Sequence, residues 1–209
     1  TTPLIRLIQT NIDKSVKESY GLYHLAILLP TRKDLGDFLR HAVHTSLPLV
    51  VAADHGYSEA IYLEDFEGNG IEVYHDKPVV EWDIREDGRI IGVTEEMAGQ
   101  EIYELGQDKV PYQMPKGTRM GHVHLSSRNS KESLEYLTTL LPVADKFSVP
   151  SGSWIASGDY HHHLAVNQWG GSHLDIRVKN IPGLAYYTVE VNDTSVFNEI
   201  LQKAIVLAS

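Results

Sequence analysis

The sequence predicts an α+β fold in which β-α-β-β-β units repeat and pair into half-open β-barrels. Residues 58–74 alternate as a strand, an acidic and glycine-rich turn and a second strand, which is the pattern of a β-hairpin. A strand that carries a histidine near its start, followed by a helix and further strands, occurs at residues 21–78 and again at residues 120–180. Repeats of about 50 residues are built from one supersecondary unit that needs a neighbour to cover its sheet. We therefore expect two units side by side, with inward side chains that meet between them.

Three further segments lie outside these two units. We interpret residues 1–20 as the remnant of a preceding unit, residues 79–119 as a connecting segment, and residues 181–209 as the start of a further, incomplete unit. The chain begins with Thr1 rather than methionine, so we also expect part of its natural beginning to be absent from the sequence.

Alternation and capping signals define the elements of the first unit. Its first strand should place Leu22, His24, Ala26 and Leu28 on one face, because side chains alternate at period two. Thr31 is a capping residue followed by apolar residues at helical spacing, which predicts the start of a helix. In the hairpin, Ile71 and Val73 should face away from Glu72 and Tyr74. The elements are expected at Gly21–Pro30 (strand), Thr31–Thr45 (helix), Pro48–Ala53, Glu59–Leu63 and Ile71–Tyr74 (strands).

The same criteria apply to the rest of the chain. The second unit should contain a helix at Ser130–Leu141 and strands at Met120–Ser126, Phe147–Val149, Ser153–Ser157 and His162–Trp169. Outside the two units the patterns predict strands at Pro3–Gln9, Arg89–Val93 and Gly183–Val191, a loop at Thr10–Tyr20, and helices at Glu95–Leu105 and Thr194–Leu207.

Composition limits the partners of the protein. The 209 residues carry a formal net charge of -10 at pH 7, with a pI near 5.5, which argues against binding to nucleic acid or to an anionic membrane. There is no cysteine, hence no disulfide framework and no thiolate ligand, and no apolar stretch is long enough to span a bilayer. We expect a cytoplasmic protein whose partners are small molecules, with homo-oligomerisation left open.

Three inward strand positions carry side chains that suit a non-haem metal site. His24 lies in the first strand of the first unit, Glu72 in its last strand, and His122 in the first strand of the second unit. Two imidazoles and one carboxylate match the facial triad of non-haem Fe(II) sites, which leaves coordination positions open. A single strand histidine is more often a core residue, and Glu72 alone could face solvent. Equivalent positions in successive repeats favour the metal interpretation.

Five segments, in order, resemble the vicinal oxygen chelate superfamily, and within it the bacterial extradiol ring-cleaving dioxygenases of the catechol 2,3-dioxygenase type. They are GLYHLAILLP, DHGYSEAIYL, EGNGIEVY, GHVHL and DYHHHLAVNQW, and the resemblance runs from Pro3 to the C-terminus. It implies paired β-α-β-β-β modules, an Fe(II) cofactor with Mn(II) as the alternative, and cleavage of a small aromatic diol by O2.

The resemblance implies a role for each matching residue. His24, Glu72 and His122 match the family's metal ligands. His122 is preferred to His124 because the family's ligand directly follows the glycine of the GH pair. Tyr62, ten residues before the glutamate, matches a tyrosine that hydrogen-bonds the bound catechol.

Two histidine assignments remain open at this point. His162 matches the family's acid/base residue, with His161 or His163 as the alternatives in the run of three. His55 is expected either to border the substrate or to serve as a turn residue bonded to the backbone.

The ligand set distinguishes oxygen chemistry from related activities. A catechol bound through both oxygens, together with O2, needs three open positions on the metal. Residues 163–169 offer no carboxylate as a counterpart of Glu72, whereas glyoxalase-type relatives use a fourth protein ligand. The alternatives are a metal-free or metal-binding small-molecule binding or resistance protein, and another enzyme of the glyoxalase superfamily.

Overall fold

A single nine-stranded mixed sheet organises the computed structural model, which describes residues 3–11, 19–178 and 180–207. The strand order is β7-β2-β3-β4-β1-β8-β11-β10-β9. Within the described residues its two edges, β7 and β9, do not pair, so the sheet is a half-open barrel, as predicted. One half of the sheet carries β1 (Gly21–Leu28), α1 (Arg32–His44), β2 (Leu49–Asp54), β3 (Ser58–Glu64) and β4 (Gly70–Asp76). The other half carries β8 (Arg119–Ser126), α3 (Ser130–Leu140), β9 (Ala144–Val149), β10 (Gly152–Ala156) and β11 (Leu164–Asn167).

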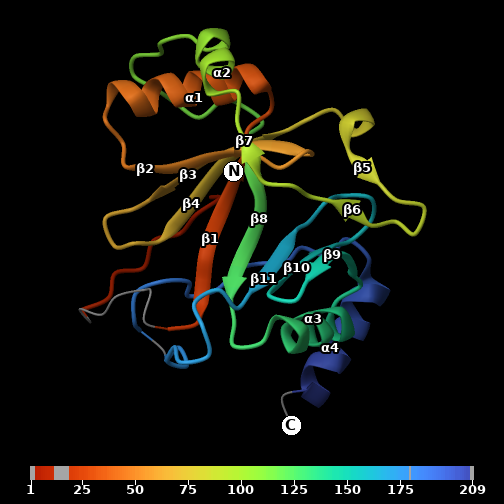
Figure 1. The fold of residues 1–209 in the computed structure, drawn as a ribbon. Helices are drawn as coiled ribbons and strands as arrows, with labels where there is room; N and C mark the ends of the chain where they lie inside the picture. The colour runs from red at the N-terminus through yellow and green to blue at the C-terminus, as the bar shows by residue number, and fades with distance from the viewer. Residues whose placement is uncertain (1–2, 12–18, 179, 208–209) are drawn as a thin grey trace.

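The two halves meet where β1 and β8 run antiparallel, side by side at the centre of the molecule (Figure 1). β4 pairs with β1 in parallel, and β11 pairs with β8 in the same way. The cross-strand pairs His24–His124 and Ala26–His122 show that the halves are related by an approximate two-fold axis through this seam. The predicted repeat is therefore present as two equivalent half-sheets.

One position on β1 differs from the expected alternation. The pairing with β8 shifts register between Leu22 and His24, which is a β-bulge at Tyr23. Leu22 packs against the apolar cluster beneath α3, while His24 faces the cavity. The prediction that Leu22 shares the face of His24 is wrong, because the extra residue of a bulge reverses the alternation.

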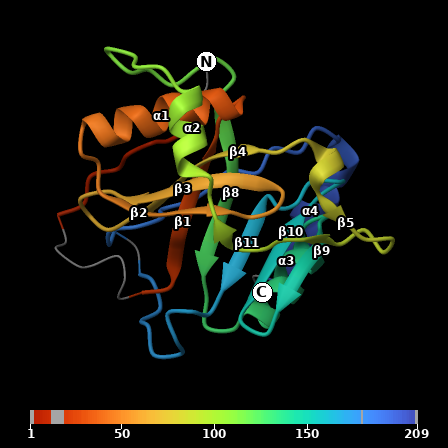
Figure 2. The same cartoon turned by 45° about the horizontal axis from the view of Figure 1, so that its top comes forward.

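Helix α1 covers the outer face of the first half-sheet, as Figure 2 shows. It begins where predicted, because the Thr31 hydroxyl accepts a hydrogen bond from the Asp34 amide at 3.1 Å. Its apolar side packs with the outward residues Ile61 and Val73 of the hairpin. The opposite face of the same hairpin is left to Glu72 and Tyr74, as expected.

The segment 79–119 is more ordered than its sequence predicts. It contains a 3-10 turn, η2 (Val79–Glu81), the short strands β5 (Asp83–Ile84), β6 (Ile90–Ile91) and β7 (Glu95–Glu96), and the helix α2 (Gly99–Leu105). The predicted helix start at Glu95 is wrong, because β7 pairs with Ala53 and Asp54 at the edge of the sheet. The strand predicted at Arg89–Val93 is reduced to β6.

The outlying segments depart further from the predictions. Neither Pro3–Gln9 nor Gly183–Val191 forms a strand, because neither segment finds a ladder partner among the described residues. Helix α4 (Thr194–Leu207) forms as predicted, and β9 begins three residues earlier than expected. The loop predicted at Thr10–Tyr20 lies largely outside the described residues. Within the described ranges, no helix combines the length and apolar character needed to cross a bilayer.

Candidate metal centre

Three buried side chains converge on the seam between the half-sheets. The Nε2 atoms of His24 and His122 lie 3.2 Å apart, and each lies 3.0 Å from Oε2 of Glu72. The exposed fractions of these residues are 6%, 3% and 2% in the order His24, His122, Glu72. Among the described residues these are the His, Asp and Glu side chains grouped closely enough to hold one metal ion. The structure thus brings together the three residues that the sequence predicted as ligands.

Two glycines allow this close approach. A Cβ atom on Gly70, the first residue of β4, would lie 2.2 Å from the Tyr23 carbonyl oxygen and 3.0 Å from the Cβ atom of His24. A Cβ atom on Gly121 would lie 2.0 Å from the hydroxyl of Tyr74, whose ring packs against His122 at 5.2 Å. Glycine therefore precedes His122 because a larger residue would displace the ring that supports it.

The protonation states favour metal binding. Burial alone would raise the pKa of Glu72, but His122 and His24 together hold it well below its usual range, so the group is a carboxylate. Burial lowers the pKa of His122, against the opposing attraction of Glu72, so a neutral ring is favoured. A neutral imidazole and an ionised carboxylate are the forms that bind metals.

The donor separations are short enough for all three atoms to share one ion. Donors about 2.1 Å from an ion, at neighbouring corners of an octahedron, lie about 3.0 Å apart, whereas tetrahedral donors lie about 3.4 Å apart. The three separations here are 3.0, 3.0 and 3.2 Å. The three residues therefore fit a facial arrangement of donors around a single ion.

The position equivalent to Glu72 in the second half-sheet holds an alanine. Glu72 on β4 is the register partner of Ala26 on β1, and Ala165 on β11 is the register partner of His124 on β8. Under the approximate two-fold relation, Ala26 corresponds to His124, so Glu72 corresponds to Ala165. Since Ala165 is fully buried and offers no donor, the site lacks a fourth donor at this position.

A cavity of about 450 Å³ opens beside the three donors. His24, Glu72 and His122 lie on its wall, together with His55, Tyr62 and His162. Aromatic and aliphatic side chains make up much of the remainder, among them Val50, Val51, Phe147, Trp154 and Trp169. The cavity can take a small molecule that reaches the three donors from a largely apolar compartment.

Tyr62 and His55 form a pair with a defined donor and acceptor. The Nδ1 atom of His55 lies 2.8 Å from the Val93 carbonyl oxygen, which can only accept, so Nδ1 carries the proton. In the neutral ring Nε2 then accepts the hydrogen bond from the Tyr62 hydroxyl at 2.7 Å. The lone pairs of the Tyr62 oxygen remain available to a ligand. His55 bonds to the backbone and also borders the cavity.

The histidines between which the sequence could not choose have different surroundings in the structure. His162 lines the cavity, and its ring lies 4.0 Å from the ring of His122. His161 is buried and bonds to Asp76, whereas His163 is exposed. His124 also lines the cavity, but its Nε2 atom bonds to Asn167 at 3.0 Å and does not join the group of three donors.

Sequence reasoning missed Asp76 and Asn167 as partners of these histidines. Asp76 lies at the end of β4, two residues beyond the predicted strand, and Asn167 lies in β11. The only local signal was a polar residue at an inward position of an otherwise apolar strand, Asn167 within LAVN.

Known proteins resemble this chain in sequence and in fold. It is 36% identical over 171 residues to the protein named Catechol-2,3-dioxygenase from Bacillus subtilis (strain 168). The match covers 81% of this chain and 60% of that relative, so the chain spans about 60% of the relative's length. No protein-family model matches the chain.

Two solved structures resemble it at low identity. A putative dioxygenase from Bacillus subtilis subsp. subtilis str. 168 has a TM-score of 0.43 and 8% identity, covering 70% of this chain and 40% of the other. Methylmalonyl-CoA epimerase from Mycobacterium tuberculosis has a TM-score of 0.40 and 9% identity, covering 71% of this chain and 87% of the other.

A half-open sheet made of two β-α-β-β-β halves, with two histidines and a glutamate gathered at their seam, defines a protein of the vicinal oxygen chelate fold. The sequence match makes the chain a homologue of the Bacillus subtilis protein named Catechol-2,3-dioxygenase.

Proposed function

We propose that this chain is an extradiol ring-cleaving dioxygenase that acts on a catechol-type aromatic with O2 and an Fe(II) ion held by His24, Glu72 and His122. The observation that carries the proposal is a buried group of three donors with no fourth donor at Ala165. Such a group leaves room on the ion for a bidentate diol and for O2. The relative's name supports the same class of reaction.

Fe(II) bound there would supply the Lewis acidity that promotes loss of the catechol protons and the electrons that pass to O2. The same donor set also suits Mn(II). The chain itself would hold the ion on the seam, exclude bulk water with the apolar walls of the cavity, and position the diol.

Tyr62 is the proposed substrate-orienting residue. Its hydroxyl donates to His55, so its oxygen can accept a hydrogen bond from a catechol hydroxyl. Burial raises the pKa of Tyr62 well above its usual range, so the side chain stays a phenol. The contact of His55 with the Val93 carbonyl fixes this direction of donation. Tyr62 and His55 therefore act as one polar wall of the cavity.

His162 is the proposed acid/base residue. Burial lowers its pKa well below its usual range, so the ring is neutral and can accept a proton from the diol. Its ring lies 4.0 Å from that of His122, and it lines the cavity. A histidine placed beside the metal ligands could take up a proton and later return it to the reacting oxygen.

Ring cleavage in air tests the proposal. Protein loaded with Fe(II) without oxygen should, on addition of catechol and then air, form a yellow semialdehyde and consume O2. Glu72→Ala should lose iron and activity together, whereas Glu67→Ala, an exposed change in the same hairpin, should retain both. Fe(II)-loaded protein that binds catechol but neither consumes O2 nor forms product would instead support a binding or resistance protein.

Other features stay predictions. They are the unit boundaries at 21–78 and 120–180, the connecting role of 79–119, a cytoplasmic location, and assembly with further copies of the chain.

A further inference from the structure

We infer that Asp76 and His161 are positioning residues that fix the tautomer of His162, so that Nε2 of His162 is its unprotonated nitrogen. The inference rests on the proposed function only for the chemical use of His162. The positions of the protons follow from the hydrogen-bond partners, with one proton on each imidazole ring.

A chain of two hydrogen bonds connects the end of β4 to the cavity. Oδ1 of Asp76 lies 2.9 Å from Nε2 of His161, and Nδ1 of His161 lies 2.7 Å from Nδ1 of His162. A carboxylate can only accept, so the Nε2 atom of His161 carries a proton. With its one ring proton on Nε2, His161 accepts at Nδ1, which requires His162 to donate from Nδ1. Nε2 of His162 is left with a lone pair.

Asp76 is itself held in place by two tyrosines. The Tyr160 hydroxyl lies 3.0 Å from Oδ2 of Asp76 and donates to it. The Tyr74 hydroxyl lies 2.8 Å from that of Tyr160, and because the Tyr160 proton is already used, Tyr74 donates. Oδ1 of Asp76 therefore accepts the hydrogen bond from His161, and Oδ2, the nearer of the two carboxylate oxygens to the Tyr160 hydroxyl, accepts the one from Tyr160.

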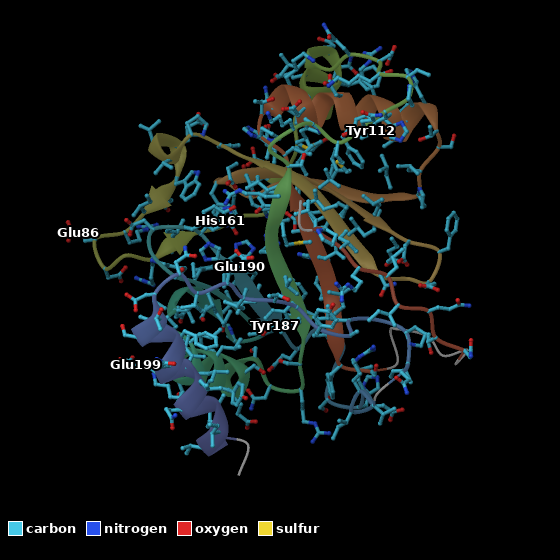
Figure 3. All side chains as sticks on the ribbon, turned by 180° about the vertical axis from the view of Figure 1, so that it is seen from behind. Glu86, Tyr112, His161, Tyr187, Glu190 and Glu199 are labelled. Atoms are coloured by element: carbon cyan, nitrogen blue, oxygen red, sulfur yellow. The ribbon has the colours of Figure 1, made fainter. Side chains whose placement is uncertain are left out.

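The ring of His161 is locked by aromatic neighbours. Its exposed fraction is 1%, and it stacks on Tyr57 with ring centroids 4.2 Å apart. Trp82, from the connecting segment, lies 5.2 Å away. Figure 3 shows His161 inside the body of the molecule, whereas Glu86 marks the tip of the loop that leaves Trp82. The ring cannot rotate freely to exchange the roles of its two nitrogens.

Of the three hydrogen-bonded residues Asp76, His161 and His162, only His162 reaches the cavity. It lines the cavity, while Asp76 and His161 do not, and its ring packs against His122. A histidine tautomer is set by the hydrogen bond that its other nitrogen makes. A wrong tautomer would present an N–H group in place of a proton acceptor, and general acid–base catalysis contributes about 10²- to 10⁴-fold to rates.

The test measures tautomers directly and does not depend on activity. Protein labelled with 15N-histidine and loaded with Zn(II), which is diamagnetic, should show His162 protonated at Nδ1 in two-dimensional 15N–1H spectra. In Asp76→Asn, Tyr160 still donates to the amide oxygen, so the amide NH2 faces His161. His161 must then accept at Nε2 and donate from Nδ1, and His162 should shift to the form protonated at Nε2.

Kinetics of the Fe(II)-loaded protein provide the second measurement. Asp76→Asn and His161→Leu should lower kcat by about 10²-fold or more, with KM changed by less than about threefold. His161→Gln should stay within about tenfold of the wild-type kcat, because its side-chain oxygen can accept from Nδ1 of His162. His44→Gln, an exposed change on α1, is the matched control and should alter neither measurement.

A wild-type His162 protonated at Nε2 would overturn the inference, and so would an Asp76→Asn protein with an unchanged tautomer and kcat. If the spectra show the expected tautomers but the Fe(II)-loaded protein cleaves no catechol, the positioning role stands and the proposed function fails.

Discussion

Ala165 occupies, in the second half-sheet, the register position that Glu72 occupies in the first. Ala165 on β11 pairs in parallel with β8, opposite His124. Glu72 on β4 pairs in parallel with β1, opposite Ala26. The two-fold relation of the halves would allow a carboxylate at both positions, but the chain provides only one. This asymmetry is what distinguishes a three-donor site from a four-donor site.

A carboxylate introduced at Ala165 should therefore convert one site into the other. We expect Ala165→Glu to keep the metal and to lower ring cleavage by about 10²-fold or more, because the new donor occupies a position needed by diol or O2. Metal content and O2 uptake measure the two effects. The matched control is Ala165→Gln, a weaker ligand of similar size, which should retain more activity. Full activity in a folded, metal-loaded Ala165→Glu protein would contradict this account.

The two histidines of the GHVHL motif should differ in their effect on the metal. His122→Gln should weaken metal binding by about 10²-fold or more, since losing even a hydrogen-bond partner of a ligand costs about 10- to 100-fold. His124→Gln should weaken it by less than about tenfold, because His124 bonds to Asn167 and stands outside the group of donors. Titration of metal-free protein with Fe(II) under anaerobic conditions compares them. Equal losses would show that the assignment of ligands is wrong.

The ligand strands were predictable because their signal is local. Alternation placed Glu72 and Tyr74 on one face of the hairpin, and the cap at Thr31 fixed the start of α1. The repeated strand with a histidine near its start indicated that His24 and His122 face one another. The choice of His122 over His124 came from the resemblance, and the register of β8 brings His122 to within 3.0 Å of Glu72.

The failures concern pairings between residues distant in sequence. Pro3–Gln9 alternates like a strand, but Leu7 is 90% exposed, since alternation alone supplies no partner. Glu95 and Glu96 belong to a helical pattern yet pair with β2 at the sheet edge. The contact of Asp76 with His161 joins positions 85 residues apart, and a run of three histidines gives no indication of which one it selects.

The stability of the first half-sheet should depend on pH through Asp37. This buried carboxylate of α1 accepts hydrogen bonds from Lys33, Lys109 and the Gln107 amide, which ties the helix to the connecting segment. Burial would raise the pKa of Asp37, but these partners lower it overall. A pKa that is lower in the folded protein stabilises it above the unfolded value of about 4, and this contribution is lost as pH falls through the folded value.

Asp37→Asn should therefore reduce the free energy of unfolding by about 1.5–3 kcal/mol at pH 7, which is typical of hydrogen bonds to a charged group. Urea unfolding of both proteins at pH 7 and at pH 3 measures the difference. We expect it to shrink at the lower pH. A difference of the same size at both values would mean that the charge of Asp37 is not the cause.

A methyl group added at Gly36, where α1 crosses α2, should destabilise the protein. A Cβ atom on Gly36 would lie 2.3 Å from the Ile102 carbonyl oxygen and 2.8 Å from the Gly106 amide nitrogen. Gly36→Ala should therefore destabilise the protein by about 1–3 kcal/mol, even though alanine is the better helix former by about 1 kcal/mol. Gly99→Ala is the matched control, because the nearest atom to its Cβ is 4.0 Å away. The midpoint temperature of thermal unfolding should be lower for Gly36→Ala than for Gly99→Ala. The reverse order would refute the close crossing of the two helices.

The fate of the oxygen atoms tests the central claim most directly. Protein loaded with Fe(II) and given catechol under 18O2 should yield a ring-opened product that carries both atoms of one O2 molecule, with one O2 consumed per catechol. Glu72→Ala protein should form none of it. A product without label, or catechol that stays bound and unchanged on the Fe(II)-loaded protein in air, would contradict a dioxygenase built on His24, Glu72 and His122.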